Sequence, residues 1–163
     1  MTTVAISLLL CAPAAAQGVR LKTVIHHAGA GVPCRALVTA PLRFAYDPFS
    51  GAGGFSTAIV TLSCIRAQLL ASVAISPGNA NRFGGYREMW RNGTDGSHVL
   101  MYDVYTTNGY EAIWGDGTGG SSVQAVNRVV TTFEAVLFAK VQYPQADVMA
   151  GEYSDTITVT FNL

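Results

Sequence analysis

The fold is decided by residues 150–163, which read Ala-Gly-Glu-Tyr-Ser-Asp-Thr-Ile-Thr-Val-Thr-Phe-Asn-Leu. From Thr156 onward, threonines alternate with apolar side chains, and this two-residue period is typical of a β-strand that buries one face. The apolar set is Ile157, Val159, Phe161 and Leu163. Because the sequence stops at this strand, we expect its outer edge to be open. Such an edge carries unpaired N–H and C=O groups and invites another strand to pair with it.

Length and composition favour a single all-β domain. The chain has 163 residues, 50% hydrophobic and 12% charged, which is enough to bury a sizeable core. Ten basic and ten acidic residues cancel, so no basic field is available for nucleic acid or an anionic membrane. Seventeen glycines with many Thr, Val, Tyr and Phe residues are typical of short strands joined by turns. We expect no membrane span, which needs about 18 apolar residues in a row.

The first residues predict an export signal. Residues 4–10 form a short apolar run, and Ala14 and Ala16 then supply the small residues of a cleavage site. We therefore expect residues 1–16 to be a signal peptide, although no Lys or Arg precedes the run. A buried first strand is the alternative.

Residues 17–27 have a second strand-like pattern. One face carries Val19, Leu21, Thr23 and Ile25, and Arg20 and Lys22 lie on the other. A glycine-rich run then precedes Cys34 and can separate the strand from the body. We expect residues 17–33 to be a free strand with its linker and residues 34–163 to be the folded domain. An ordinary first strand, paired within its own sheet, is the alternative.

The rest of the chain predicts about six or seven short antiparallel strands at the spacing of a β-sandwich. We expect further strands over residues 55–64, 69–75, 98–106, 110–114 and 129–141, and irregular connections over 37–48 and 79–96. After Cys11 leaves with the signal, Cys34 and Cys64 remain. An even pair in an exported protein predicts one disulfide, with two buried thiols as the alternative. Neither cysteine has a Cys or His neighbour at zinc spacing, so we expect no metal site.

No motif points to catalysis or to a cofactor. Residues 115–120 match G-x-G-x-x-G, but the preceding buried strand, the following helix and the later acidic residue of a dinucleotide site are not convincing, so we expect a hairpin loop. The three histidines lie in no triad pattern. Scattered acids, among them Asp116, leave a secreted hydrolase as an alternative. Asp155 is expected instead to bond nearby backbone where the last strand begins.

A series of motifs runs along the chain. In order, they are Cys34, Leu42-Arg43-Phe44-Ala45-Tyr46-Asp47-Pro48, Cys64, Arg87-Glu88-Met89, Leu100-Met101-Tyr102, Trp114-Gly115-Asp116 and Ala150-Gly151-Glu152-Tyr153-Ser154-Asp155-Thr156. Together they resemble the spore coat protein U domain family over nearly the whole mature chain. Most members of that family look like subunits of archaic chaperone-usher pili of Gram-negative bacteria.

The resemblance implies an incomplete immunoglobulin-like antiparallel β-sandwich that lacks its final strand. Such a subunit is held by a periplasmic chaperone, passes an outer-membrane usher, and is completed by the N-terminal strand of the next subunit in an extracellular fimbrium. The implied donor anchors are Val19, Leu21, Thr23 and Ile25, the acceptor groove is Ile157, Val159 and Phe161, and the disulfide joins Cys34 to Cys64. The implied role is adhesion or biofilm formation. A self-contained secreted sandwich that coats a surface or binds carbohydrate is the alternative.

Overall fold

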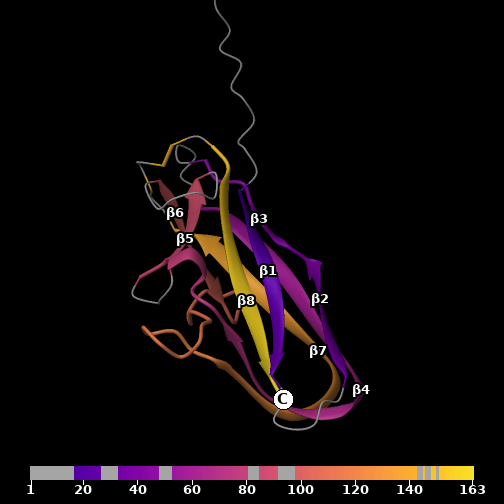
Figure 1. Ribbon diagram of the computed structural model, residues 1–163. Helices are drawn as coiled ribbons and strands as arrows, with labels where there is room; N and C mark the ends of the chain where they lie inside the picture. The colour runs from indigo at the N-terminus through magenta and orange to yellow at the C-terminus, as the bar shows by residue number, and fades with distance from the viewer. Residues whose placement is uncertain are drawn as a thin grey trace, which may run out of the picture.

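The computed structural model describes residues 17–26, 33–47, 53–80, 85–91, 98–142, 145, 148–149 and 151–163. In this part the chain forms eight strands, one 3-10 turn and no α-helix (Figure 1). The expected all-β sandwich is confirmed. No helical segment among these residues has the length and apolar character that crossing a membrane requires. The expected signal peptide, residues 1–16, and most of the linker lie outside the described residues.

The strands wrap around one core. They are β1 Gln17–His26, β2 Cys34–Ala40, β3 Leu42–Phe44, β4 Phe55–Ile75, β5 Arg87–Arg91, β6 Val99–Tyr105, β7 Gln124–Val141 and β8 Tyr153–Asn162, with a 3-10 turn at Gly78–Ala80. Their order in the sheet is β2-β4-β7-β6-β5-β8-β1-β3. Because β4 also pairs with β8 through residues 72–75, the strands fold back over one another (Figure 1). The buried apolar side chains form one cluster between them.

The long pair β4 and β7 sets which side chains enter the core. On β4, Ala58, Val60 and Leu62 are fully buried, as the alternation predicts. Farther along β4 the buried positions change from even to odd numbers, since Leu70 is followed by Val73 and Ile75. The change coincides with a register shift between Leu70 and Ser72, and Leu69 is 58% exposed. An extra residue in one strand turns every later side chain to the opposite face, and composition alone does not locate it.

Three segments differ from the sequence-based expectation. The expected irregular connection over residues 37–48 contains most of β2 and all of β3, separated only by Pro41. The expected surface connection over residues 79–96 contains β5, which buries Arg87 and Met89. The predicted strand at 110–114 is reduced to two isolated bridges, from Ile113 to Tyr105 and from Trp114 to Ser122. The first two expectations were wrong because proline and charged residues interrupt the alternation of strands that are nevertheless paired.

Cys34 and Cys64 form the predicted disulfide, with their sulfur atoms 2.05 Å apart. Cys34 is the first residue of β2 and lies directly opposite Cys64 on β4 in the antiparallel register. The bond therefore joins the beginning of β2 covalently to the longest strand of the fold.

Replacing both cysteines by serine is expected to lower the free energy of unfolding by about 2 to 5 kcal/mol, because the unfolded chain is released from a closed loop. The sequence separation of 30 residues places this loop in the range where such a constraint is substantial. Urea unfolding of the oxidised protein and of the double variant measures the difference. Wild type treated with reductant should match the variant, and a loss below about 1 kcal/mol would contradict the expectation.

Candidate functional site

The structural feature that bears on function is the place of β1 in the sheet. β1 runs parallel to β8, from Gly18 opposite Ser154 to His26 opposite Asn162, and its first residues run antiparallel to β3 (Figure 1). The pairings of the described strands give β3 no other neighbour, and β4 and β5 pair with β8 along its other edge. Removing β1 would therefore leave a slot bordered by the edges of β8 and β3.

The side chains of β1 alternate between core and solvent. Val19 is 2% exposed, and Thr23 and Ile25 are half-buried on the same side. Arg20, Lys22, Val24 and His26 are exposed. Leu21 pairs through its backbone with Ile157. The strand thus presents the predicted inward positions Val19, Thr23 and Ile25 to the domain and its basic side chains to solvent.

The predicted groove residues form the opposite side of this contact. Ile157, Val159 and Phe161 are all fully buried and lie in register with residues 21, 23 and 25 of β1. The structure therefore brings the two predicted sets of residues together.

This contact lies within one chain, which corrects the expectation of an open edge beside the last strand. The part from β2 to β8 does lack a strand on this side of β8, as expected. The chain's own β1 fills the place, as the alternative of a first strand paired within its own sheet predicted. The pairing is parallel, whereas only antiparallel strands were expected from the sequence.

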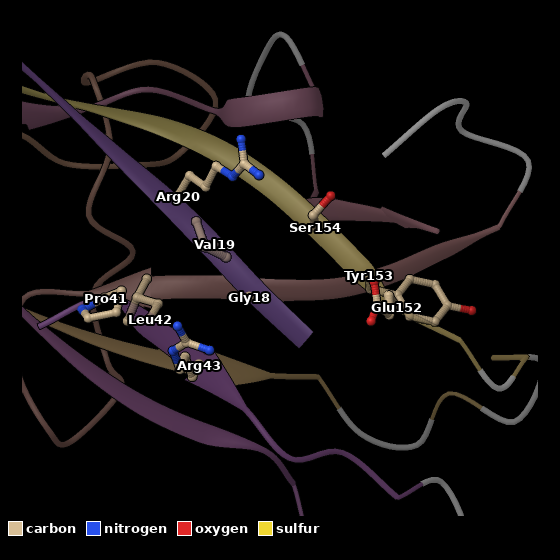
Figure 2. Close-up of a pocket in the computed structure, with 9 residues that line it drawn as sticks. All are labelled: Gly18, Val19, Arg20, Pro41, Leu42, Arg43, Glu152, Tyr153 and Ser154. Atoms are coloured by element: carbon tan, nitrogen blue, oxygen red, sulfur yellow. The ribbon is translucent and has the colours of Figure 1, made fainter. Parts of the chain in front are cut away.

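A hollow of about 460 Å³ opens at the start of β1. It is lined by residues 18–20 of β1, by residues 41–43 around β3 and by residues 152–154 at the start of β8 (Figure 2). Figure 2 shows the Arg20 and Arg43 side chains on either side of β1, and Glu152 at the rim. Gly18 carries no side chain here, and an added Cβ would meet Leu42 O only at 3.7 Å. The hollow therefore marks one open end of the slot.

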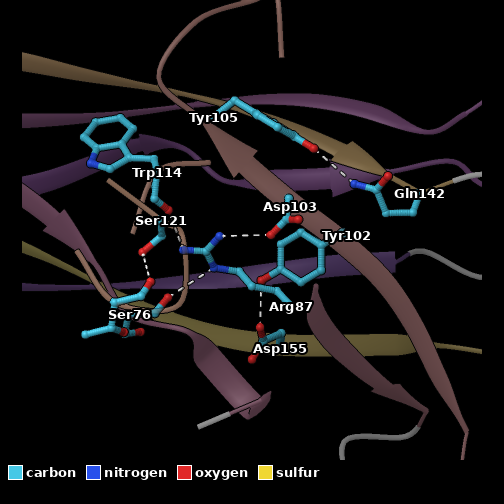
Figure 3. Close-up of polar contacts among 10 residues, drawn as sticks. Ser76, Arg87, Tyr102, Asp103, Tyr105, Trp114, Ser121, Gln142 and Asp155 are labelled. Atoms are coloured by element: carbon cyan, nitrogen blue, oxygen red, sulfur yellow. Dashed lines mark hydrogen bonds and ion pairs between the residues drawn. The ribbon is translucent and has the colours of Figure 1, made fainter. Parts of the chain in front are cut away.

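A buried hydrogen-bond network fixes the start of β8 next to this end (Figure 3). The Tyr102 hydroxyl donates to Asp155 Oδ2 at 2.6 Å. Asp155 Oδ1 accepts from the backbone N–H of Asn79 at 2.8 Å and from that of Thr156 at 2.6 Å. The expectation that Asp155 bonds nearby backbone is confirmed. Burial raises the pKa of Asp155, although these hydrogen bonds oppose the rise. Since Asp155 lies in register with Val19, the network fixes the part of β8 that pairs with the first residues of β1.

Arg87 lies at the centre of a second part of this network and is fully buried. Its Nε donates to Ser76 O at 3.1 Å, its Nη2 to Trp114 O at 2.7 Å, and its Nη1 to Asp103 Oδ1 at 3.4 Å (Figure 3). The guanidinium thus ties β5 to β6 and to the segments around Ser76 and Trp114. From the sequence, Arg87 was expected in a surface connection. The only signal of its buried role was the Arg-x-Met motif of the family resemblance.

The stability of the domain is expected to fall between pH 4 and 6 because of Asp103. Burial raises the pKa of this carboxyl to about 6, against the attraction of Arg87. In the unfolded chain the group ionises near its ordinary value of about 4. Within this window only the folded state keeps the proton, so the stabilisation is complete below about pH 4 and is lost as the pH rises through 6.

Urea unfolding between pH 4 and 7 measures this dependence, and Asp103→Asn provides the comparison. Over this window the free energy of unfolding of wild type should fall by up to roughly 3 kcal/mol more than that of the variant, because the pKa of Asp103 is raised by about two units and each unit corresponds to about 1.4 kcal/mol. If the free energy of unfolding depends on pH identically in the two proteins, Asp103 has its ordinary pKa in the folded state.

The loop that carries the glycine motif is a turn. Asp116 accepts hydrogen bonds from the backbone N–H of Thr118 at 2.9 Å and from its hydroxyl at 2.6 Å, and these bonds lower the pKa of Asp116. In the described part of the chain, no group of three or more His, Cys, Asp and Glu side chains is arranged to hold a metal ion. The carboxylate named for a hydrolase is thus engaged in shaping its own loop.

The fold and the slot define a structural β-sandwich domain that its N-terminal strand completes. The chain matches the Spore Coat Protein U domain over residues 24–160 and belongs to this family. The match starts within β1, so residues 17–23 precede it. The family is one of pilus- or coat-type structural domains of the cell exterior and is not a known enzyme family. A comparison with curated proteins finds no similar sequence.

Proposed function

We propose that this chain is a structural subunit of a secreted bacterial pilus, in which β1 of one copy completes the sheet of the next copy beside β8. One observation carries the proposal. β1 fills a slot between the edges of β8 and β3, yet the chain connects it to the rest of the domain only through residues 27–33. A strand held in this way can be replaced by the same strand of a second copy without change to the rest of the fold.

The contact is strong enough to hold a fibre together. Burying an apolar side chain such as Val19 contributes about 1.5 to 3 kcal/mol, and each backbone hydrogen bond about 0.5 to 1.5 kcal/mol. Ile25 adds to the buried apolar surface, and the pairing with β8 continues as far as His26. A head-to-tail contact of this kind does not close on itself and therefore produces a filament.

The same slot accounts for the proposed partners. Before a strand enters it, the backbone edge of β8 and the apolar side chains behind it are open to other chains. A periplasmic chaperone that lends a strand of its own would cover this edge during export. An outer-membrane usher would then pass the subunit into an extracellular fimbrium, with adhesion or biofilm formation as the biological role.

Deleting residues 17–26 tests the proposal, because the truncated copy keeps the slot but has no strand to donate. We expect no fibres from it by electron microscopy. When it is expressed together with the full chain, it should cap one end of growing fibres and shorten them. The control is Arg20→Ser with Lys22→Ser, which changes two exposed side chains of β1 and should leave fibre length unchanged. Fibres of normal length from the truncated chain alone would refute the proposal.

A second function is favoured by the position of β1 in its own sheet. A chain that fills its own slot can be a self-contained secreted sandwich that coats a surface or binds carbohydrate. This alternative predicts a monomer at every concentration, with no need for a chaperone. Sedimentation of the chain across a wide concentration range, with chaperone and usher present, distinguishes the two functions.

A further inference from the structure

The direction of β1 follows from how it is joined to β2. β1 ends at His26 and β2 begins at Cys34, and both lie at the end of the molecule where β8 finishes (Figure 1). The backbone N–H of Leu163 donates to the carbonyl of His26 at 2.8 Å, which ties the end of β1 to the C-terminus. Residues 27–33 therefore connect two strand ends on the same side of the domain.

A reversed β1 would stretch this connection almost to its limit. Fully extended, residues 27–33 carry the chain at most roughly 28 Å from His26 to Cys34. Reversing β1 would move His26 from its place opposite Asn162 to the place opposite Ser154, about 26 Å away at about 3.3 Å per residue. Within one chain the parallel direction is therefore favoured, because it leaves the connection unstretched. A strand that comes from another copy has no such restriction.

We propose that the self-paired form is a closed subunit whose β1 must leave its own slot before the β1 of a neighbour can enter, and that this opening limits the rate of assembly. The inference rests on the proposed pilus function and concerns the regulation of the same slot. Because the closed chain covers its own edge, an isolated subunit is expected not to aggregate through β8.

The chain's own β1 has a much higher effective concentration at the slot than the β1 of a neighbour. A strand on a short tether experiences an effective concentration in the millimolar range. At micromolar subunit concentration, a neighbour's β1 is therefore disfavoured by about a thousandfold relative to the chain's own strand.

Two features ease the opening of the closed form. Parallel pairing is slightly less stable per residue than antiparallel pairing. In addition, Thr23 presents a polar side chain toward Val159 in the middle of the contact. The pairing of β1 with its own chain is thus favoured by proximity but weakened by its direction and by Thr23, which suits a temporary closure.

A covalent lock tests the closure directly. Val24 and Thr160 are register partners on the outer side of the sheet, and adjacent strands place their Cα atoms within the range that a disulfide accepts. Oxidised Val24→Cys/Thr160→Cys protein should stay monomeric and lose assembly, and reductant should restore assembly. Wild type in the same reductant controls for opening of the native disulfide. The matched control, Val24→Cys/Thr156→Cys, is four residues out of register, roughly 13 Å, and should form no bond within a monomer.

Assembly kinetics provide the second measurement. If opening is limiting, the initial rate per subunit should level off as the wild-type concentration rises. Thr23→Val should lower that plateau severalfold, because it strengthens the contact that has to open. A rate that rises in proportion to concentration throughout, or a Thr23→Val variant that assembles faster, would overturn the inference.

The outcomes separate this inference from the function on which it rests. If deletion of residues 17–26 abolishes fibres but the in-register cysteine pair does not form its bond in the monomer, the closure is wrong and the pilus function stands. If the bond forms fully and wild type remains monomeric at every concentration with chaperone and usher present, the proposed function is wrong and the chain is a closed sandwich.

Discussion

Val19→Asp is expected to release β1 and abolish fibre formation. Val19 is 2% exposed and lies in register with the buried carboxyl of Asp155. A carboxylate at this position loses its hydration beside a second acidic group, and the burial of the valine is lost as well. We expect the free energy of unfolding to fall by at least about 3 kcal/mol, measured by urea unfolding, and fibre yield to fall below detection by electron microscopy.

The matched control lies on the same strand. Val24 is 38% exposed and faces away from the core, so Val24→Asp introduces the same charge without burying it. It should change stability by no more than about 0.5 kcal/mol and leave fibres intact. Equal effects of the two substitutions would mean that β1 does not bind through the face that the structure shows.

Arg87→Met is expected to lower the free energy of unfolding by about 3 to 5 kcal/mol. The substitution removes the charge that faces Asp103, and it leaves the carbonyl groups of Ser76 and Trp114 without the guanidinium that donates to them. Methionine fills part of the volume but donates no hydrogen bond. Because these contacts connect β5 to β6 and to two connecting segments, the loss should affect the whole domain in a single cooperative transition by urea unfolding.

A double-mutant cycle identifies the origin of that loss. Arg87→Met/Asp103→Leu removes both charges and should recover part of the stability, since the uncompensated buried carboxylate is gone. Arg66→Met, at an exposed position of β4, serves as the control and should stay within about 0.5 kcal/mol of wild type. An Arg87→Met protein as stable as this control would show that the buried network contributes nothing to folding.

The strands with regular alternation were predictable from the sequence. β8 and the buried positions of β7 from Phe133 to Val141 follow their two-residue period without interruption, because each strand buries one face along its length. The disulfide was also predictable, since the expected removal of Cys11 leaves two cysteines and one possible pairing.

The parts that were missed have physical reasons. β5 was missed because its buried Arg87 looks like a surface residue unless the carbonyl groups and the carboxylate around it are known. The strands expected over residues 55–64 and 69–75 form one strand, β4, and its register shifts were missed because a register shift is a property of two paired strands and not of one sequence.

The self-pairing of β1 could not be chosen from the sequence alone. The inward set of Val19, Thr23 and Ile25 suits its own slot and that of a neighbour equally well, because alternation specifies a face and not a partner. What decides the direction in the closed chain is the length of residues 27–33, a geometric constraint that becomes visible only when the ends of β1 and β2 are placed.

The disulfide has a mechanical consequence for a subunit within a fibre. A pulling force that enters through the N-terminal segment would reach the body at Cys34, the first residue of β2. There the sulfur bridge passes the load at once to Cys64 in the middle of β4. In the proposed fibre, peeling of β2 from its neighbour would thereby be prevented, and the domain would bear tension through its longest strand.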